Sequence, residues 1–343
     1  MEIFTILQSL IISFFSFNNW KMPAKKRIII YDKARTQIIE KYLRKEDYII
    51  LDVRYKNNNS LNFLIIFKLF LKLNLTPKTY KNEFIKAVSP KFIISMIDNN
   101  VGFYRMKQEF PKIKFILIQF AWRQNIKTRI ISKNEINTKS KIKNVIDFFI
   151  VFNESLKKEF QQVIKSKYLV FGSFTSNSFK INNKSLRYKY VIIGQNTSLD
   201  FNKKMPEGRT VGEFYKPDLD FYKALCDYII KNRNEKVYIL GKSLFNEGAM
   251  DFYDNLLGKG NYHYINRSGY SYDVLNKSKF IFGTTSTLLY EALSRGKRVG
   301  IFSHKSKIKY FKNTAFGWPT KFKKRGPFWT DSIQDKEIDR IVN

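Results

Sequence analysis

The sequence predicts an α/β protein made of two doubly wound domains, each a parallel sheet covered by helices. Short apolar runs alternate with amphipathic segments along nearly the whole chain. The 343 residues also exceed the usual size of a single domain. A polar stretch rich in Lys and Asn at 177–189 separates two groups of such segments. We therefore expect an apolar extension at 1–23, a first domain at 24–178 and a second at 188–343.

The first half contains six apolar runs of strand length, separated by segments with helical periodicity. The segment 61–73 is strongly apolar, yet it is too short and too charged to span a membrane, which favours a buried helix. The predicted strands are 27–31, 48–53, 92–97, 115–118, 147–152 and 168–172, and the other predicted helices are 34–43, 80–87 and 103–110.

The second half repeats this alternation. Strands are predicted at 190–194 and 237–242, with a helix at 221–231 before the second of them. The strand at 237–242 ends in Gly241-Lys242, but no P-loop pattern surrounds this pair. The most informative segment is 279–302, which reads as strand, hydroxyl-rich turn, helix, Gly and strand. This is one βαβ unit.

The turn of that unit gathers four hydroxyl side chains, Thr284 to Thr287, where a strand ends and a helix begins. Unpaired N–H groups and the positive end of the helix dipole make such a junction a good seat for phosphate. Glu291 follows Thr287 by one helical turn, so its carboxylate could accept hydrogen bonds from a ribose. A helix start that is merely capped by Ser or Thr explains the same residues equally well.

Polar residues also follow two neighbouring strands in the first half. Asp98, Asn99 and Asn100 come after one strand, and Gln119 and Arg123 come after the next. Ligands of doubly wound sheets bind beyond the carboxyl ends of the strands, so these residues should lie at one edge. Ordinary turn chemistry is the alternative interpretation, since Asp and Asn are common turn formers.

The composition restricts the partners of the chain. A net charge of +33 favours anionic partners. Lys is scattered through almost every segment without a nucleic-acid-binding signature, which favours an anionic membrane surface or acidic substrates over nucleic acid. Cys226 is the single cysteine, so a disulfide framework and a cysteine metal site are excluded and a reducing compartment fits. His263 and His304 lack the spacing of a two-histidine metal site.

The first residues carry an apolar run at 3–17. It has the length of a signal-peptide core but lacks a basic start and a small-residue cleavage site. An interfacial anchor, an extension from an upstream start codon and a degenerate signal all remain open. We favour a peripheral or spurious extension over cleaved export.

A series of strings runs in order along the chain: Asp98-Asn99-Asn100, Ile118-Gln119 with Arg123, Val151-Phe152-Asn153, Gly172 to Asn177, Ser286-Thr287-Leu288, Tyr290-Glu291-Ala292, Arg295-Gly296-Lys297, Phe316-Gly317-Trp318-Pro319 and Gly326 to Thr330. Taken together, these strings resemble the bacterial surface carbohydrate biosynthesis protein family, from about Lys25 to the C-terminus. The family usually has Gln-Asn-Gly where this chain has Gln119-Phe120-Ala121, a departure that removes an amide and a glycine. The chain also ends soon after Trp329, short of an expected final helix.

This resemblance implies two Rossmann-like domains facing a central cleft, the GT-B layout, and a glycosyltransferase of O-antigen or capsule assembly. A nucleotide-activated sugar would be the donor and a glycan or lipid-linked glycan the acceptor. Scattered Lys and Arg would neutralise the leaving group, so we expect neither a metal nor a cofactor. The enzyme would be cytoplasmic, or peripheral at the inner face of the cytoplasmic membrane.

The resemblance also implies roles for individual residues. The acceptor would lie near Asn99, Asn100, Gln119 and Arg123, with Asp98 as the candidate general base; an Asp that caps the next helix is the alternative. The aromatic segment at 317–329 is either a sugar platform or a packing lock. The donor nucleotide would be held by Gly241, Lys242, Ser271, Thr284, Thr285, Ser286, Thr287 and Glu291.

Two other classes of function remain open. The altered Gln119-Phe120-Ala121 string is compatible with a catalytically silent subunit of carbohydrate assembly. The charge alone is compatible with a basic scaffold that binds membrane or nucleic acid.

Overall fold

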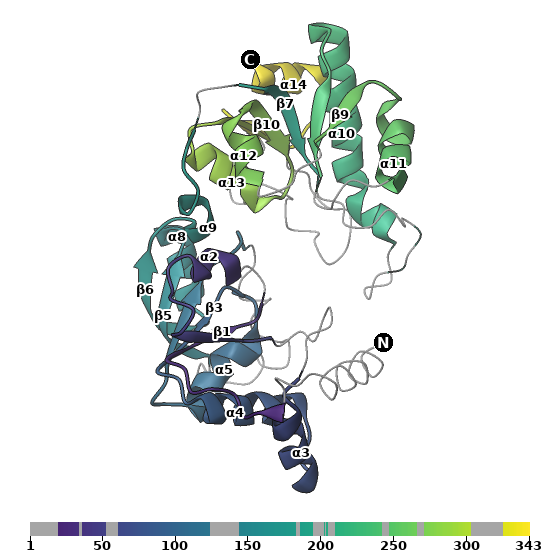
Figure 1. Cartoon of the computed structure of the whole chain (residues 1–343). Helices are drawn as coiled ribbons and strands as arrows, with labels where there is room; N and C mark the ends of the chain where they lie inside the picture. Colours follow the sequence, from purple (N-terminus) through teal and green to yellow (C-terminus); the bar gives the residue numbers. More distant parts are fainter. Residues whose placement is uncertain are drawn as a thin grey trace, which may run out of the picture. The chain divides into compact units, whose positions relative to one another are not determined.

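The chain folds into two compact units, Met1–Ser178 and Phe179–Asn343, each with its own sheet and core (Figure 1). The computed structural model describes residues 20–33, 36–52, 61–123, 144–182, 186–194, 202, 204, 210–241, 247–265, 271–302 and 325–343, the side chains of 214 and 247–249 excepted. The predicted apolar run at 3–17 and His304 lie outside these residues. The predicted cleft concerns the placement of the two units and stays a prediction.

The first unit contains a six-stranded, fully parallel sheet in the order β2-β1-β3-β4-β5-β6. Its strands are β1 (Ile28–Tyr31), β2 (Tyr48–Leu51), β3 (Phe92–Ser95), β4 (Lys114–Ile118), β5 (Val145–Val151) and β6 (Lys165–Val170). Its helices are α2 (Thr36–Glu40), α3 (Phe63–Leu71), α4 (Pro77–Val88), α5 (Val101–Glu109), α8 (Glu154–Gln161) and α9 (Phe174–Asn177).

The core of this unit lies between the sheet and four of its helices. Alternate strand residues such as Phe115, Leu117 and Phe149 are fully buried, as a strand period of two requires. They pack against side chains of α3, α4, α5 and α8. The helices begin where the sequence offers a cap: Asn62, Thr76, Asn100 and Asn153 each accept a hydrogen bond from a backbone N–H in the first turn.

The second unit contains a seven-stranded sheet in the order β12-β13-β11-β10-β7-β8-β9. All its pairs are parallel except the β12–β13 hairpin at one edge. Its strands are β7 (Tyr188–Ile193), β8 (Val237–Leu240), β9 (Tyr262–Tyr264), β10 (Ser278–Gly283), β11 (Arg298–Phe302), β12 (Arg325–Gly326) and β13 (Trp329–Thr330). Its helices are α10 (Val211–Arg233), α11 (Glu247–Leu257), α12 (Ser271–Asn276), α13 (Thr287–Ser294) and α14 (Asp335–Val342).

This sheet is covered by helices on both faces. In β10, Phe280 and Phe282 pack with α10, α11 and α14, whereas Ile281 between them packs with α12 and α13. The alternation follows from the strand period of two and makes the unit doubly wound, as predicted. Cys226 of α10 lies in the first of these layers, fully buried, and burial raises the pKa of its thiol to about 11.

Two helices of this unit correct the sequence prediction. The helix expected at 221–231 starts ten residues earlier, at Val211, because Thr210 and Glu213 form a capping box there and the helix continues through Pro217. A final helix exists after all: α14 packs Ile338 and Val342 into the core, and Glu337 binds Arg340 at 2.8 Å.

In the first unit, α3 corrects the expectation of a buried helix. Its residues Ile65, Ile66 and Leu69 are buried, but Phe67 and Phe70 are 49% and 62% exposed. Of the helices that the structure describes, none has the length and apolar content needed to cross a bilayer.

Candidate functional site

The second unit has its topological switch point between β7 and β10. These strands are parallel neighbours, and the chain leaves β7 toward β8 but leaves β10 toward β11, in opposite directions across the sheet. Crevices at such points, beyond the carboxyl ends of the strands, are where doubly wound sheets bind ligands. The ends of β7 and β10 therefore define the candidate site of this unit.

The junction from β10 to α13 supplies polar groups at that point. Ser286 is the N-cap of α13, and its Oγ accepts a hydrogen bond from the N–H of Leu288 at 3.3 Å. Thr285, Ser286 and Thr287 are all half-buried, so each retains some access to solvent. A helix start leaves N–H groups without partners inside the helix, and its dipole favours negative charge. The junction can thus hold a phosphate.

Thr284 differs from the other three hydroxyl residues because its side chain is fully buried. Its Oγ1 donates a hydrogen bond to the carboxylate of Asp218 on α10. Burial raises the pKa of Asp218 to about 6, and the hydrogen bond from Thr284 lowers it less. Thr284 therefore ties β10 to α10 through its hydroxyl, and its role in binding phosphate stays a prediction.

Asp218 belongs to the string Asp218-Leu219-Asp220, a pattern that can hold metal in other settings. Here the two carboxylates diverge, because residues two apart on a helix face different directions. Asp220 is exposed and pairs with Lys216 at 3.1 Å. Within the described ranges, no three His, Cys, Asp or Glu side chains gather as a metal site.

Glu291 lies on α13 as predicted, but it points into the unit. It is only 6% exposed, and its Oε2 accepts a hydrogen bond from the Tyr272 hydroxyl at 2.8 Å. Tyr272 in turn stacks on Phe179 at 4.7 Å between ring centroids. A ribose contact by Glu291 would therefore compete with its bond to α12.

The Arg295-Gly296-Lys297 string anchors the start of the second unit. The Arg295 guanidinium donates to the backbone oxygens of Phe179 at 3.2 Å and Lys180 at 2.9 Å. Lys297 donates to the backbone oxygen of Asn276 at 2.6 Å. Gly296 has φ +74, a conformation that favours glycine and ends α13. This part of the resemblance has a structural explanation.

Gly241 also has a packing explanation. A Cβ at this position would lie 1.6 Å from the Tyr264 hydroxyl oxygen, so any side chain here would have to displace Tyr264. At Gly194, directly after β7, a Cβ would make only a tight contact, 3.1 Å from the Tyr253 hydroxyl oxygen. Lys242 lies outside the described residues. Ser271 is the first residue of α12 and is half-buried, and its phosphate role stays a prediction.

In the first unit the switch point lies between β1 and β3, and the predicted acceptor-side residues follow β3 and β4. Asp98 is buried, with its side chain 0% exposed. Its Oδ1 accepts from the Arg123 guanidinium, at 2.8 Å from Nε, and its Oδ2 accepts from the N–H groups of Phe120 at 3.1 Å and Ala121 at 3.2 Å. The structure thus brings Asp98 and Arg123 together. These bonds favour a role in positioning the loop over that of a general base.

Gln119 and Asn100 are used within the fold in a similar way. The Gln119 side chain is 1% exposed, accepting from the Phe152 N–H at 2.9 Å and donating to the Ala121 oxygen at 3.0 Å. Asn100 caps α5 by accepting from the N–H of Phe103, and Asn99 is exposed. Ala121 is not among the described non-glycine residues with positive φ, so replacing glycine there causes no backbone strain.

Three residues of these edges escaped the sequence analysis: Asp32, Asp218 and Tyr272. Asp32 directly follows β1, is 2% exposed and has φ +79, which non-glycine residues rarely adopt. Asp32 could have been predicted as a residue of this edge, because it directly follows the predicted strand at 27–31. Asp218 and Tyr272 could not have been predicted in this way, because their partners Thr284 and Glu291 are distant in sequence.

The family of the chain can now be stated. A family model described as "putative O-antigen biosynthesis protein" matches residues 116–343. The chain belongs to this family. The resemblance to surface carbohydrate biosynthesis proteins is thereby confirmed at the level of the family. The matched region includes the β10–α13 junction of the second unit and the loop after β4.

Solved structures of similar fold share little sequence with this O-antigen family member, and no curated protein matches it in sequence. Staphylococcus aureus MnaA, solved with UDP, is 13% identical with a TM-score of 0.46, over 81% of this chain and 79% of that one. The Methanocaldococcus jannaschii UDP-GlcNAc 2-epimerase, solved with UDP-GlcNAc and UDP, is 11% identical with a TM-score of 0.48, over 81% and 83%. TarM is 13% identical with a TM-score of 0.44, and this chain spans 51% of it.

Proposed function

We propose that this member of the O-antigen biosynthesis family is a glycosyltransferase that moves a sugar from a nucleotide-activated donor to a surface polysaccharide acceptor. Membership of the family supports surface carbohydrate as the product. The observation that carries the donor assignment is the β10–α13 junction, where half-buried hydroxyls and a capped helix start lie at the switch point of the second unit.

The donor side of the proposal rests on Thr285, Ser286 and Thr287. Their hydroxyls and the first N–H groups of α13 would bind the phosphates of the nucleotide sugar, where negative charge grows as the sugar leaves. Glu291 would reach the ribose only if its bond to Tyr272 were exchanged for one to the ligand. Ser271 and Lys242 remain proposed further contacts of the nucleotide.

The acceptor side rests on the loop after β4. Asp98 acts in this proposal as a positioning residue that fixes Arg123 and the backbone of Phe120 and Ala121. The Arg123 side chain is 17% exposed, so part of its guanidinium could reach an anionic acceptor such as a lipid-linked glycan. No described residue is assigned as the general base.

The reaction is proposed to need no metal, because lysine and arginine side chains can neutralise the leaving phosphate. The place of action is proposed as cytoplasmic, with peripheral association at the inner face of the membrane supported by the net charge of +33. Turnover that persists at full rate in excess EDTA is the expected result. Loss of turnover in EDTA and its recovery with a divalent ion would contradict metal independence.

A catalytically silent subunit of carbohydrate assembly is the second candidate. The observation that favours it is the complete internal use of Asp98 and Gln119, together with the altered Gln119-Phe120-Ala121 string. A transferase needs a base or another way to activate its acceptor hydroxyl.

A two-step experiment separates the candidates. Thermal-shift measurements with cytidine, uridine and guanosine nucleotides first identify a base that stabilises the folded chain. The matching nucleotide sugars are then incubated with lipid-linked glycan acceptors and release of the nucleotide is followed. A transferase releases nucleotide only with an acceptor present. Binding without release on any acceptor would favour the silent subunit, and the absence of any saturable shift would overturn both.

A further inference from the structure

The outer side of α3 carries a run of large apolar side chains that the core does not cover. Phe67, Phe70 and Leu71 are 49%, 62% and 67% exposed, and Leu73 just beyond the helix is 93% exposed. Within the first unit, Figure 1 shows α3 beyond α4 at the periphery, away from the sheet. An exposed apolar group of this kind marks an interaction surface more often than chance.

Aromatic packing extends this surface toward the start of the described chain. Trp20, itself 41% exposed, lies 4.4 Å from the Phe63 ring, and Phe63 stacks on Phe67 at 6.3 Å. Leu75, in the turn between α3 and α4, is 47% exposed. We call Trp20, Phe67, Phe70, Leu71, Leu73 and Leu75 the α3 surface.

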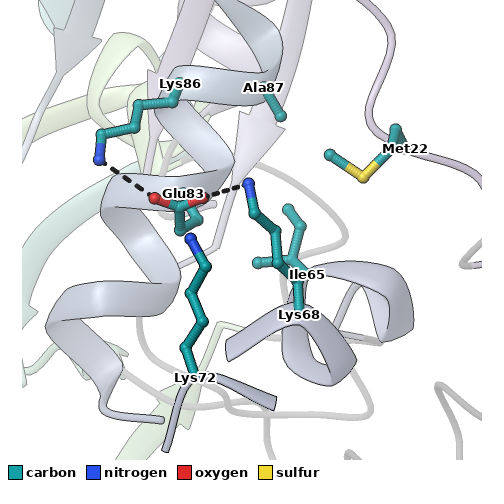
Figure 2. Close-up of a pocket in the computed structure, with 7 residues that line it drawn as sticks. All are labelled: Met22, Ile65, Lys68, Lys72, Glu83, Lys86 and Ala87. Carbon is teal, nitrogen blue, oxygen red and sulfur yellow. Dashed lines mark hydrogen bonds and ion pairs between the residues drawn. The ribbon is translucent and has the colours of Figure 1, made fainter. Parts of the chain in front are cut away.

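A basic pocket adjoins the α3 surface, between α3 and α4 (Figure 2). Lys68 and Lys86 both bind Glu83, at 2.7 and 3.1 Å. Lys72 extends its ammonium group toward the same place, and no ion-pair partner is found for it in the part of the chain that the structure describes (Figure 2). The pocket thus holds three ammonium groups and one carboxylate, which pairs with two of them, and this leaves an excess of positive charge beside exposed apolar side chains.

We propose that the α3 surface and its lysine pocket dock the protein on an anionic lipid bilayer. Phe67, Phe70 and Leu71 enter the boundary between headgroups and acyl chains, and Lys68, Lys72 and Lys86 contact the phosphates of the headgroups. Surfaces that bind in the plane of a membrane combine these two features, apolar bulk and flanking lysine. The proposal does not depend on the transferase reaction.

The positive charge of the lysine pocket favours an anionic bilayer over a second copy of the chain as the partner of the α3 surface. An isologous contact through the α3 surface would bring the two lysine pockets close together, which repels like charges. A nucleic acid would use the lysines but would leave five exposed aliphatic and phenyl side chains of the α3 surface without a partner. An anionic bilayer offers acyl chains to the apolar side chains and headgroup phosphates to the lysines.

The test is co-sedimentation of the full chain with vesicles of phosphatidylcholine containing about 30% phosphatidylglycerol, and with vesicles of phosphatidylcholine alone. We expect binding to the anionic vesicles. The triple variant Phe67→Ser, Phe70→Ser, Leu71→Ser should weaken that binding at least tenfold. Lys68→Gln, Lys72→Gln, Lys86→Gln should weaken it at least as much, since each lysine near an anionic surface contributes roughly fivefold.

Matched controls carry the same changes elsewhere. Leu169, Ile181 and Leu186 are 45%, 58% and 59% exposed, and their replacement by Ser should leave vesicle binding unchanged. Lys158, Lys259 and Lys277 are exposed lysines for a matched Gln triple. Because all these side chains are exposed, the variants should keep the wild-type melting temperature.

Four results would overturn the proposal. Wild-type chain that ignores anionic vesicles, or binding that survives both α3 triples, would exclude this surface, and in the second case residues 1–19 become the candidate anchor. Loss of binding in the lysine triple but not in the apolar triple would reduce the effect to general attraction by charge. An apolar triple that changes sedimentation from dimer to monomer without affecting vesicle binding would assign the surface to a second copy.

Discussion

The carboxyl edges of the two sheets use their polar side chains in opposite ways. In the first unit, the described hydrogen bonds of the Asp98 and Gln119 side chains go to Arg123 and to backbone groups of Phe120, Ala121 and Phe152. In the second unit, Thr284 and Glu291 are likewise buried and bonded within the fold, but Thr285, Ser286 and Thr287 stay half-buried at a helix start. The same position in a doubly wound sheet can therefore be locked or left open. The proposed function assigns the nucleotide to the open edge.

The largest loss of stability is expected when the hydrogen bonds of the buried Asp98 carboxylate are removed. Asp98→Ala would leave the Arg123 guanidinium and two backbone N–H groups without their partner. Removing one member of a buried ion pair costs about 3–5 kcal/mol, and we expect a loss of that size in the free energy of unfolding by urea. The double variant Asp98→Leu, Arg123→Leu should lose less than Asp98→Ala. A loss below about 1 kcal/mol for Asp98→Ala would show that the edge is not locked.

The second-largest effect on stability is expected at Asp218, whose carboxylate accepts a hydrogen bond from Thr284 beside the open edge. Its pKa is raised from 3.8 to about 6 in the folded chain. Such a group favours folding below pH 4, and that contribution is lost as pH rises through about 6. Asp218→Asn should thus stabilise the chain by about 3 kcal/mol at pH 8 and have little effect at pH 4.

Chemical denaturation across this pH range measures the Asp218 effect. The matched control is Asp220→Asn, on the same helix but exposed and paired only with Lys216. It should change stability by less than about 1 kcal/mol at every pH. A variant Asp218→Asn that is less stable than the wild type at pH 8 would contradict the assigned pKa.

A smaller loss is expected at Gln119 in the locked edge. Gln119→Leu removes an acceptor from the half-buried Phe152 N–H and a donor from the Ala121 oxygen. Leaving such groups unpaired costs about 1–3 kcal/mol, to be read from the urea midpoint. At about pH 4, where a buried Glu is protonated, Gln119→Glu keeps an acceptor for Phe152 and a donor for Ala121, and it should lose less stability than Gln119→Leu. Equal losses in both variants would mean that the hydrogen bond to Phe152 contributes nothing.

The smallest effect is expected at the open edge. Ser286→Ala removes the cap of α13, and Asn153→Ala removes the corresponding cap of α8 in the first unit. Each should cost about 1 kcal/mol in the free energy of unfolding. Similar losses in the two variants would show that Ser286 contributes no more to stability than an ordinary cap. This is expected if the open edge binds a ligand and is not held closed by bonds within the fold. A loss above about 3 kcal/mol would place Ser286 in the same class as Asp98.

The strands could be predicted from the sequence because buried parallel strands are short apolar runs. The runs at 27–31, 115–118 and 279–283 became β1, β4 and β10 with one residue added or lost at an end. The exposure of α3 could not be predicted, because its own apolar residues occur on all sides of the helix and their periodicity does not indicate which side is buried. The final helix was predictable from Ile338 and Val342, spaced one turn apart, but was overlooked.

The candidate site was predictable in position only. Polar residues after strand ends do lie at the edges of the two sheets, as Asp98, Gln119 and Ser286 show. Whether their polar atoms face a ligand depends on partners that the sequence does not reveal. Asp98 meets Arg123 across 25 positions of the chain, and Thr284 meets Asp218 across 66.

The most direct test of the open edge places a negative charge on it. Thr287→Glu puts a carboxylate in the first turn of α13, where the helix dipole tolerates it but a phosphate would be repelled. The matched control is Ser155→Glu, in the first turn of α8. We predict that a nucleotide raises the melting temperature of the wild type and of Ser155→Glu but not of Thr287→Glu. A shift that persists in Thr287→Glu would contradict the assignment of the nucleotide site to the β10–α13 junction.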